Sequence, residues 1–200
     1  MLKRAFDVTL ATVGLVLSAP LWVLVAAAVR MEDGGPVFFG QARYGRGGVP
    51  FTAWKFRSMV PDAGSQPAVA ALAADPRVTR VGRVLRATAL DELPQLWNIL
   101  RGHMSVVGPR ALAVSEVEVG GDGRSVPQHE LPGFEERHRV RPGLTGLTQI
   151  YADRDLSRVR KYRLDRLYAR RAGFALDLRL VLLSFWITVL GRWERRGRKV

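Results

Sequence analysis

The hydrophobic pattern of the chain is dominated by one long apolar run near its start. From Val8 to Val29 there are 22 residues without a charge, bounded by Lys3-Arg4 before the run and Arg30 after it. As a straight helix the run would be about 33 Å long, enough to cross a hydrocarbon core of roughly 30 Å. The run exceeds the apolar region of about 7–15 residues that is usual in a secretory signal peptide. A plain transmembrane anchor remains as an alternative.

A proline inside the run favours a third interpretation, a helix that enters the membrane and returns. Pro20 removes the hydrogen bond to the carbonyl of Val16 and clashes with it, which predicts a bend, and Ser18 could bind a freed backbone group. Cations flank both ends of the run, so the positive-inside rule gives no direction of crossing. A broken helix whose two ends lie on the same face accounts for both observations.

The middle of the chain predicts a body of short strands and helices. Residues Val37–Phe39 and Pro50–Phe56 are aromatic runs typical of strands, and Gly40–Gly48 between them has the turn residues and cations of a phosphate-handling loop. In a strand, Lys55 and Arg57 would share one face, with two aromatic side chains on the other. An amphipathic strand with a solvated basic face is the alternative.

Helix signals follow the strands. Asp75-Pro76 is typical of a helix start, with the aspartate as N-cap. A proline is tolerated only in the first turn of a helix, so Pro94 predicts a helix that begins near Leu90 or Asp91 and runs to Gly102. Arginines recur every third residue before this helix, at Arg77, Arg80, Arg83 and Arg86.

The last third of the chain alternates loops with basic and apolar segments. Residues 120–133 have the composition of a flexible loop, and Arg141–Gly146 reads as a turn that carries a cation. Arg154–Arg171 is strongly basic, which suits a solvated helix face or contact with anionic headgroups. Leu180–Leu190 is too short to span a membrane and predicts a core or interfacial helix, and Arg192–Lys199 forms a basic tail.

Composition narrows the chemistry. The chain has 200 residues, with 31 Lys+Arg against 18 Asp+Glu, a net charge of +13, no cysteine and three histidines. The missing cysteines exclude disulfides and thiolate chemistry, and the histidines lack the close spacing of a zinc helix. The charge calls for polyanionic partners, which are nucleic acid, nucleotide phosphates or an anionic membrane surface. A membrane-tethered basic binding module would explain the charge and the apolar run.

The acid pair Asp91-Glu92 is not explained by a binding module. Among so many cations, two adjacent carboxylates suit a site that holds a phosphorylated substrate beside a nucleophile, base or metal ligand. At the positive end of a helix and near arginines, Asp91 is expected to be ionised. The structural alternative is a capping box formed by Thr88 and Asp91.

Eight motifs, in order, resemble those of the bacterial sugar transferase family, the monotopic polyprenyl-phosphate phosphoglycosyl transferases. The resemblance runs from about Met1 to about Leu190 and predicts an α+β fold, with a re-entrant membrane helix over 1–32 and a catalytic domain with interfacial amphipathic helices over 33–200. The motifs are Lys3-Arg-x-Phe-Asp7, Gln41-x-Arg-x-Gly45, Trp54-Lys-Phe-Arg-Ser-Met59, Asp75-Pro-Arg-Val-Thr79, Gly82-Arg-x-Leu-Arg86, Asp91-Glu-Leu-Pro-Gln-Leu-Trp-Asn98, Met104-Ser-Val-Val-Gly-Pro-Arg110 and Arg141-Pro-Gly-x-Thr-Gly146.

The resemblance implies transfer of a sugar-1-phosphate from a UDP-sugar to a polyprenyl phosphate such as undecaprenyl phosphate, at the cytoplasmic face of the bacterial inner membrane. Asp91 would be the nucleophile and a ligand of Mg²⁺, and would carry a covalent phosphosugar after UMP leaves. Glu92 would orient or deprotonate a reacting group. Substrate phosphates and nucleotide would be bound by Lys55, Arg57, Arg86, Arg110 and Arg141. The implied partners are the two substrates and a lipid bilayer, not nucleic acid, and a homodimer stays an open alternative.

Three positions depart from the family pattern. A Ser-Pro pair at the break of the membrane helix is here Ala19-Pro20, a usual aspartate before the Met-Ser motif is His103, and a usual second proline after Gly-Pro-Arg is Ala111. The change at His103 removes an acid near the site, and the change at Ala111 is expected to loosen a loop that seats the nucleotide. Neither alters the acid pair. The identity of the sugar and the glycoconjugate pathway do not follow from these residues.

Overall fold

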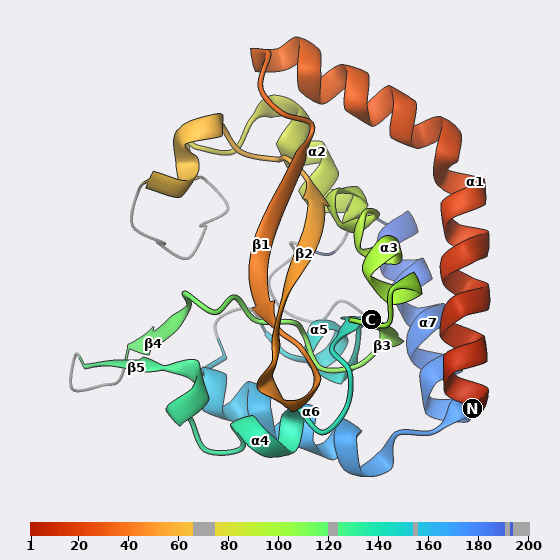
Figure 1. The fold of residues 1–200 in the computed structure, drawn as a ribbon, viewed down its shortest axis with the longest axis vertical. Coiled ribbons are helices and arrows are strands. Elements are labelled where there is room, and N and C mark those ends of the chain that lie inside the picture. The colour runs from red at the N-terminus through yellow and green to blue at the C-terminus, as the bar shows by residue number, and fades with distance from the viewer. Residues whose placement is uncertain (66–74, 120–123, 154–155, 191–192, 194–200) are drawn as a thin grey trace.

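The apolar run forms one long helix, α1 (Leu2–Asp33), which contains Pro20 and bends part-way along its length (Figure 1). Proline has no N–H to donate and its ring crowds the preceding turn, which is the physical cause of such a bend. The Ser18 hydroxyl lies 3.5 Å from the carbonyl of Leu15 and accepts a hydrogen bond from the indole of Trp22 at 3.0 Å. Its recorded backbone partner is thus Leu15, one residue before the carbonyl that the proline frees.

This computed structural model describes residues 1–65, 75–119, 124–153, 156–190 and 193. Within them, α1 is the one helix that is long and apolar enough to cross a membrane, and only 11% of its most apolar window is buried inside the protein. The interpretations made for 120–123, for Arg154 and Asp155 and for most of the basic tail lie outside the described residues.

The first two strands form an antiparallel hairpin, β1 (Phe38–Tyr44) and β2 (Pro50–Phe56), in which Phe39 faces Lys55 and Arg43 faces Phe51. The assignment of Gly40–Gly48 to a loop is therefore wrong for its first half, because its first five residues continue β1. Only the residues between the strands turn, through a short 3₁₀ turn, η1 (Arg46–Gly48). Gly47 and Gly48 have φ values of 69° and 75°, a conformation that glycine adopts without strain.

The next helix, α2 (Arg80–Thr88), begins later than the sequence suggested. Thr79 is the N-cap, and its hydroxyl accepts from the backbone N–H of Gly82 at 2.9 Å. Asp75, predicted to be the cap, instead binds Arg77 through both the backbone N–H and the guanidinium. A local ion pair thus competes successfully for the carboxylate, and the chain turns before the helix starts.

A 3₁₀ turn and a short helix follow, η3 (Leu90–Glu92) and α3 (Gln95–Leu100), joined through Leu93 and Pro94 in helical conformation. The predicted helix is confirmed in position, but its first turn is 3₁₀ and it ends at Leu100. The remaining elements, apart from the 3₁₀ turns η2 (Pro61–Ser65) and η4 (Gln128–Glu130), are β3 (Ser105–Val107), β4 (Val117–Val119), β5 (Ser125–Pro127), α4 (Phe134–Arg137), β6 (Gly143–Thr145), α5 (Leu147–Tyr151), α6 (Arg158–Arg171) and α7 (Phe174–Val189).

The strands pair as three small sheets, β1–β2, the parallel pair β3–β6 and the hairpin β4–β5. The main core lies where α1, α3, α5 and α7 meet β3, and it includes Ala11, Ile99, Val107, Ile150 and Leu180. Figure 1 shows α7 beside the first half of α1. Helix α7 buries Leu180 and Ile187 but exposes other apolar side chains, which include Leu182, Phe185, Trp186 and Val189. The predicted helix at the C-terminal end is confirmed, and its exposed apolar residues suit an interface with lipid.

Both ends of α1 are fixed to the body by charged side chains. Near the N-terminus, Lys3 binds Asp177 of α7 at 2.7 Å, and Arg4 donates to the carbonyls of Ile99 and Leu100 at 2.6 and 2.7 Å. Asp7 is buried and accepts from the Ser105 hydroxyl and the backbone N–H of Val106. These contacts hold the start of α1 against α3, α7 and β3.

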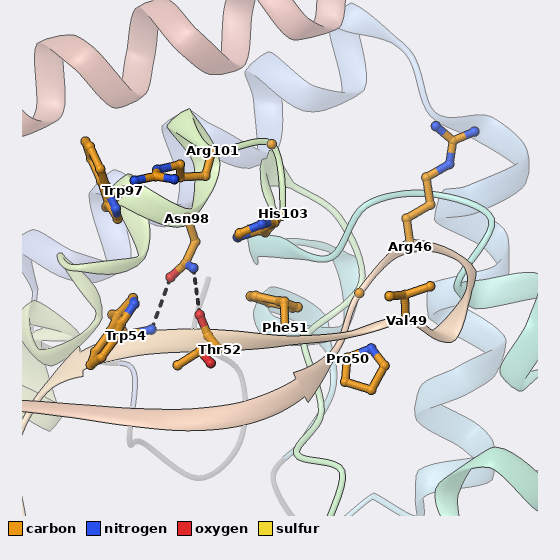
Figure 2. Close-up of a pocket in the computed structure, with 12 residues that line it drawn as sticks. Arg46, Val49, Pro50, Phe51, Thr52, Trp54, Trp97, Asn98, Arg101 and His103 are labelled. Atoms are coloured by element: carbon orange, nitrogen blue, oxygen red, sulfur yellow. Dashed lines mark hydrogen bonds between the residues drawn. The ribbon is translucent and has the colours of Figure 1, made fainter.

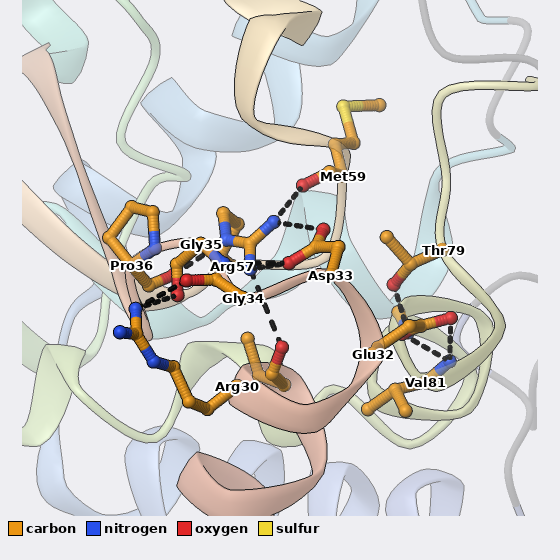
Figure 3. Close-up of polar contacts among 12 residues, drawn as sticks. Arg30, Glu32, Asp33, Gly34, Gly35, Pro36, Arg57, Met59, Thr79 and Val81 are labelled. Carbon is orange, nitrogen blue, oxygen red and sulfur yellow. Dashed lines mark hydrogen bonds and ion pairs between the residues drawn. The ribbon is translucent and has the colours of Figure 1, made fainter.

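At the other end, the last turn of α1 binds α2 and the end of β2 (Figure 3). Glu32 accepts from the backbone N–H groups of Arg80 and Val81, the first residues of α2. Asp33 forms an ion pair with Arg57. The apolar middle of α1 is therefore the only part of this helix without a charged contact to the body among the described residues.

Candidate active site

The acid pair lies in the turn that connects α2 to α3. Ala89 has a positive φ of 57° and ends α2, and η3 then carries both acids in its single turn. Asp91 has 7% of its surface exposed. The capping-box alternative is wrong, because the Thr88 hydroxyl donates back to the carbonyls of Val84 and Leu85 and η3 has no side-chain cap. Neither carboxylate is needed to satisfy a helix end.

Two cations reach the acid pair from other parts of the chain. The Nζ atom of Lys55 lies 3.3 Å from Oδ2 of Asp91 and 2.5 Å from Oε1 of Glu92. Arg110 lies 3.7 Å from the same oxygen of Glu92, and nearly half of its side chain is exposed. The largely buried ammonium group of Lys55 therefore bridges the two acids, and the half-exposed Arg110 remains accessible to an anionic ligand.

Burial and charge move the pKa values of the two acids apart. Burial raises the pKa of Asp91; the charge of Glu92 adds to this, and Lys55 and Arg86 only partly oppose it. Burial also acts to raise the pKa of Glu92, but Lys55 and Arg110 outweigh it and bring this pKa to about 2. The expected influence of the arginines is confirmed, since Arg86 acts to lower the pKa of Asp91, but burial outweighs it and the net shift is upward. Lys55 is the group that lies nearest to oppose protonation.

A further arginine, which sequence reasoning did not select, lies behind the pair. Arg43 of β1 is buried, its guanidinium donates to Gln41 and to the carbonyl of Ala111, and burial lowers its pKa. Its charge in turn helps to lower the pKa of Glu92. The signal was the alternation of Gln41 and Arg43 along a strand, which was obscured when Gly40–Gly48 was read as a loop.

The backbone around Arg110 is fixed by close contact between two loops. A Cβ atom on Gly108 would lie 2.3 Å from the carbonyl oxygen of Arg141, so only glycine fits at this crossing. The buried guanidinium of Arg137 donates to the carbonyl of Arg110 at 2.7 Å and also pairs with Asp165 at 2.9 Å. These contacts fix the backbone position from which the Arg110 side chain extends.

Asn98 joins α3, the helix that follows the acid pair, to β2, the strand that carries Lys55 (Figure 2). Its side-chain carbonyl accepts from the backbone N–H of Trp54 at 3.1 Å, and its NH₂ group donates to the carbonyl of Thr52 at 2.7 Å. The amide thus completes the free edge of β2 as a neighbouring strand would. Because Lys55 follows Trp54 directly, this contact positions the lysine relative to Asp91 and Glu92.

The other predicted binding residues are distributed. Arg86 lies in the last turn of α2, and its charge acts to lower the pKa of Asp91. Arg57 is buried and donates to Asp33 and to the carbonyls of Pro36 and Met59, so its guanidinium is occupied at the end of α1 (Figure 3). Arg141 donates to the carbonyl of Gly102 at 2.8 Å. The structure therefore brings Lys55, Arg110 and Arg86 to the acid pair and gives Arg57 and Arg141 other contacts.

The acid pair alone does not form a complete metal site, but it suits a magnesium ion whose other ligands come from substrate and water. No group of three or more metal-ligating side chains occurs among the described residues. Mg²⁺ is commonly held by one or two carboxylates together with substrate phosphates and water. Asp91 and Glu92 are the side chains that would hold such an ion, with Arg110 open to the anionic substrate beside it.

Comparison with known proteins shows the family to which the chain belongs. A family model described as bacterial sugar transferase matches residues 1–191. The chain belongs to the bacterial sugar transferase family. It is 43% identical over 187 residues to a protein named UDP-glucose:undecaprenyl-phosphate glucose-1-phosphate transferase from Klebsiella pneumoniae, a match that covers 91% of this chain. The corresponding match in Escherichia coli K12 is 41% identical and covers 92% of the chain.

The chain spans less than half of the length of the first relatives that it matches. It spans 39% of the length of the Klebsiella and Escherichia proteins. It spans 87% of the exopolysaccharide production protein ExoY from Rhizobium meliloti, to which it is 41% identical over 207 residues. The matched region therefore corresponds to a part of the longer proteins and to most of ExoY.

The departures from the family pattern have defined places in this sugar transferase. Ala111 is buried, and its carbonyl accepts from Arg43 at 2.6 Å, so this part of the loop is tied to β1. His103 is exposed, and its ring lies 5.7 Å from that of Phe51. No hydrogen bond or ion pair joins His103 to either acid in the described structure, so the change from the usual aspartate alters a neighbouring surface and not the contacts of Asp91 and Glu92.

Proposed function

We propose that this protein transfers a sugar-1-phosphate from a UDP-sugar to undecaprenyl phosphate and so begins the assembly of a membrane glycoconjugate. The observation that carries the proposal is the buried Asp91–Glu92 pair, bridged by Lys55 and faced by Arg110. Family membership and the names of the relatives support the same reaction class. Because relatives are named for UDP-glucose, UDP-glucose is the first donor to test.

The proposed reaction has two displacements at one phosphorus. A carboxylate oxygen of Asp91 attacks the phosphorus that bears the sugar, the bond to the UMP oxygen breaks, and UMP leaves with the electron pair. An oxygen of the lipid phosphate then attacks the phosphosugar on Asp91, and the aspartate is released. Glu92 orients the reacting groups, and Arg110 and Arg86 stabilise the negative charge that moves between phosphate oxygens.

Lys55 keeps the nucleophile ready. Burial raises the pKa of Asp91, which would favour the unreactive acid, and the ammonium group 3.3 Å away opposes protonation. When Mg²⁺ is bound, it supplies charge neutralisation of the diphosphate, and Asp91 and Glu92 are the side chains that would hold it. The site therefore suits anionic substrates, and its burial keeps most water away from Asp91.

The fixed ends of α1 support a monotopic arrangement at the cytoplasmic face. Lys3 and Arg4 bind the body at one end of the helix, and Glu32 and Asp33 bind the same body at the other. A helix that crossed the bilayer would place these two sets of contacts about 30 Å apart on opposite surfaces. We therefore infer that α1 enters one leaflet, bends at Pro20 and returns.

The nucleophile can be tested by trapping. Incubated with UDP-glucose or another UDP-sugar, Mg²⁺ and no acceptor, the wild-type protein is expected to gain the mass of one sugar phosphate and release UMP. Asp91→Asn should give neither, because an amide is a poor nucleophile, while Glu92→Gln should still form some adduct at a reduced rate. An adduct of the same mass on Asp91→Asn would refute the assignment.

The topology can be tested by cysteine labelling, since the chain has no native cysteine. Single cysteines at Leu2 and Gly34 should both react with a membrane-impermeant maleimide only from the cytoplasmic side. Replacing Pro20 by leucine restores the helical hydrogen bond and should move the Leu2 position toward the other side, with loss of activity. Periplasmic labelling at Leu2 in the otherwise unchanged protein would mean an ordinary transmembrane helix.

A further inference from the structure

A cavity lies at the edge of β2, apart from the acid pair (Figure 2). It has a volume of about 580 Å³ and opens between the β1–β2 turn and the C-terminal end of α3. Neither Asp91 nor Glu92 lines it. We refer to it as the β2–α3 cleft, and the side chains that matter for its chemistry are Arg46, Phe51, Trp54, Trp97, Arg101 and His103.

The cleft combines cations with exposed aromatic rings. Arg46, Arg101 and His103 are exposed, and no Asp or Glu belongs to its lining among the described residues. Trp54 and Trp97 expose 41% and 47% of their surfaces, and the Arg101 guanidinium lies 4.9 Å from the centre of the Trp97 ring. Large aromatic groups are seldom left open to water in this number without a partner. The lining therefore suits a ligand with an anionic group and an apolar part.

The hydrogen-bonding groups of the cleft favour a phosphate over a nucleotide base. The amide of Asn98 is already used twice by the backbone of β2, at Thr52 and Trp54. The side chains that remain are mainly donors, from the guanidinium groups of Arg46 and Arg101. A base presents donors as well as acceptors and needs both in return, whereas a phosphate only accepts.

The position of the cleft indicates a membrane lipid. Arg4, at the start of α1, donates to the carbonyls of Ile99 and Leu100, so the apolar helix begins directly beside the end of α3 that lines the cleft. Tryptophan and arginine side chains at such a level are typical of the headgroup region of a bilayer. Lys55 lies on the face of β2 opposite to Trp54, so the cleft and the acid pair are separate sites.

We propose that the β2–α3 cleft binds an anionic phospholipid of the bilayer, not a substrate. Arg101, beside Trp97, binds its phosphate, Arg46 adds positive charge at the opposite end of the cleft, and Trp54 and Trp97 contact the glycerol and the first carbons of its chains. This lipid fixes the depth at which α3 lies and thereby the level of the acid pair. The lipid takes no part in the transfer step itself, because no hydrogen bond or ion pair joins the lining residues to Asp91 or Glu92 in the described structure.

The proposal can be tested by native mass spectrometry of the full chain in an uncharged detergent. Phosphatidylglycerol, phosphatidylcholine, undecaprenyl phosphate and UMP are each titrated, and an apparent Kd is measured for each. The decisive variant is Arg46→Gln with Arg101→Gln. Both positions are exposed and should tolerate the change, and a thermal melt of the double variant checks that it folds. If it does not fold, the single Arg101→Gln variant is used in its place. Arg163→Gln, on the exposed side of α6, removes one positive charge outside the cleft and is the matched control for the single Arg101→Gln variant, which is measured beside the double variant.

The expected result is an increase of about 30-fold in the Kd for phosphatidylglycerol in the double variant, from about fivefold for each cation at low salt. Arg163→Gln should leave this Kd within about twofold of wild type, and the Kd for undecaprenyl phosphate should not change in either variant. Three outcomes would overturn the proposal: an equal loss in Arg163→Gln, an unchanged Kd for phosphatidylglycerol in the double variant, or a loss confined to undecaprenyl phosphate or UMP. The last result would make the cleft a substrate site.

Discussion

Replacing Lys55 by methionine tests how the acid pair is kept ionised. Methionine keeps most of the length of the side chain but removes the ammonium group, which lies 3.3 Å from Asp91 and 2.5 Å from Glu92. Two charges 3.3 Å apart at an effective dielectric constant of about 20 attract by about 5 kcal/mol. Water entry and the nearby arginines offset part of this loss, so we expect a net effect of about 3 kcal/mol, within the usual range for one partner of a buried pair.

A loss of about 3 kcal/mol corresponds to a rise of about 2 units in the pKa of the pair. Since burial already raises the pKa of Asp91, this further rise should protonate the nucleophile at a pH where the wild type is ionised. The acid limb of the profile of kcat/KM against pH should therefore move up by about 2 units. UMP release, measured from pH 5 to 9 at one Mg²⁺ concentration, reports this shift.

The same substitution has a predicted effect on stability. Because the folded-state pKa of Glu92 is about 2, below its ordinary value of 4.5, ionised Glu92 stabilises the fold above about pH 4.5 and loses this contribution as the pH falls toward 2. The difference in Tm between wild type and Lys55→Met should thus narrow as the pH falls from 7 to 3.

Lys55→Arg keeps the charge and should keep the acid limb near its wild-type position even if kcat falls. An unmoved acid limb in Lys55→Met would refute the reasoning.

Other predictions concern the cations, the metal and the scaffold. Arg110→Ala and Arg86→Ala should each lower kcat/KM by on the order of 10²-fold, measured by UMP release, and changes of only a few-fold in both would contradict their role. EDTA should stop turnover and Mg²⁺ should restore it; full activity in EDTA would exclude the proposed metal. Asn98→Ala should lower the free energy of unfolding by about 2–4 kcal/mol in a denaturant titration, because it leaves the N–H of Trp54 and the carbonyl of Thr52 without their partner. A loss below 1 kcal/mol would mean that water replaces the amide.

Local patterns predicted the parts of the fold that depend on neighbouring residues. The restriction that Pro94 places on the preceding turn was enough to locate the helical run that carries the acid pair. Strand alternation placed Lys55 on one face of β2, and the structure brings its ammonium group to Asp91 and Glu92. These features are set by one residue or by a period of two, and tertiary contacts do not override them.

Features that depend on distant partners were not predictable in the same way. Lys55 and Arg57 are equivalent in the alternation, yet Arg57 binds Asp33, 24 residues earlier in the chain. The N-cap of α2 is Thr79 and not Asp75, because the Asp75 carboxylate binds Arg77. The ionisation expected for Asp91 neglected burial, which no local pattern reports. In each case the deciding group is one that the fold, and not the neighbouring sequence, brings into contact.

The contacts of α3 make the position of the acid pair depend on the membrane helix. Arg4 of α1 binds the last carbonyls of α3, Asn98 in its middle binds β2, and Glu92 at the turn before it binds Lys55 of the same strand. A displacement of α1 along the membrane normal would therefore pull on α3 and, through Asn98, on the strand that carries Lys55. Because the attraction between Lys55 and Asp91 weakens as their separation grows beyond 3.3 Å, such a displacement would raise the pKa of Asp91 further. We infer that insertion of α1 at the correct depth is a condition for an ionised nucleophile, which ties chemistry at the acid pair to contact with the bilayer.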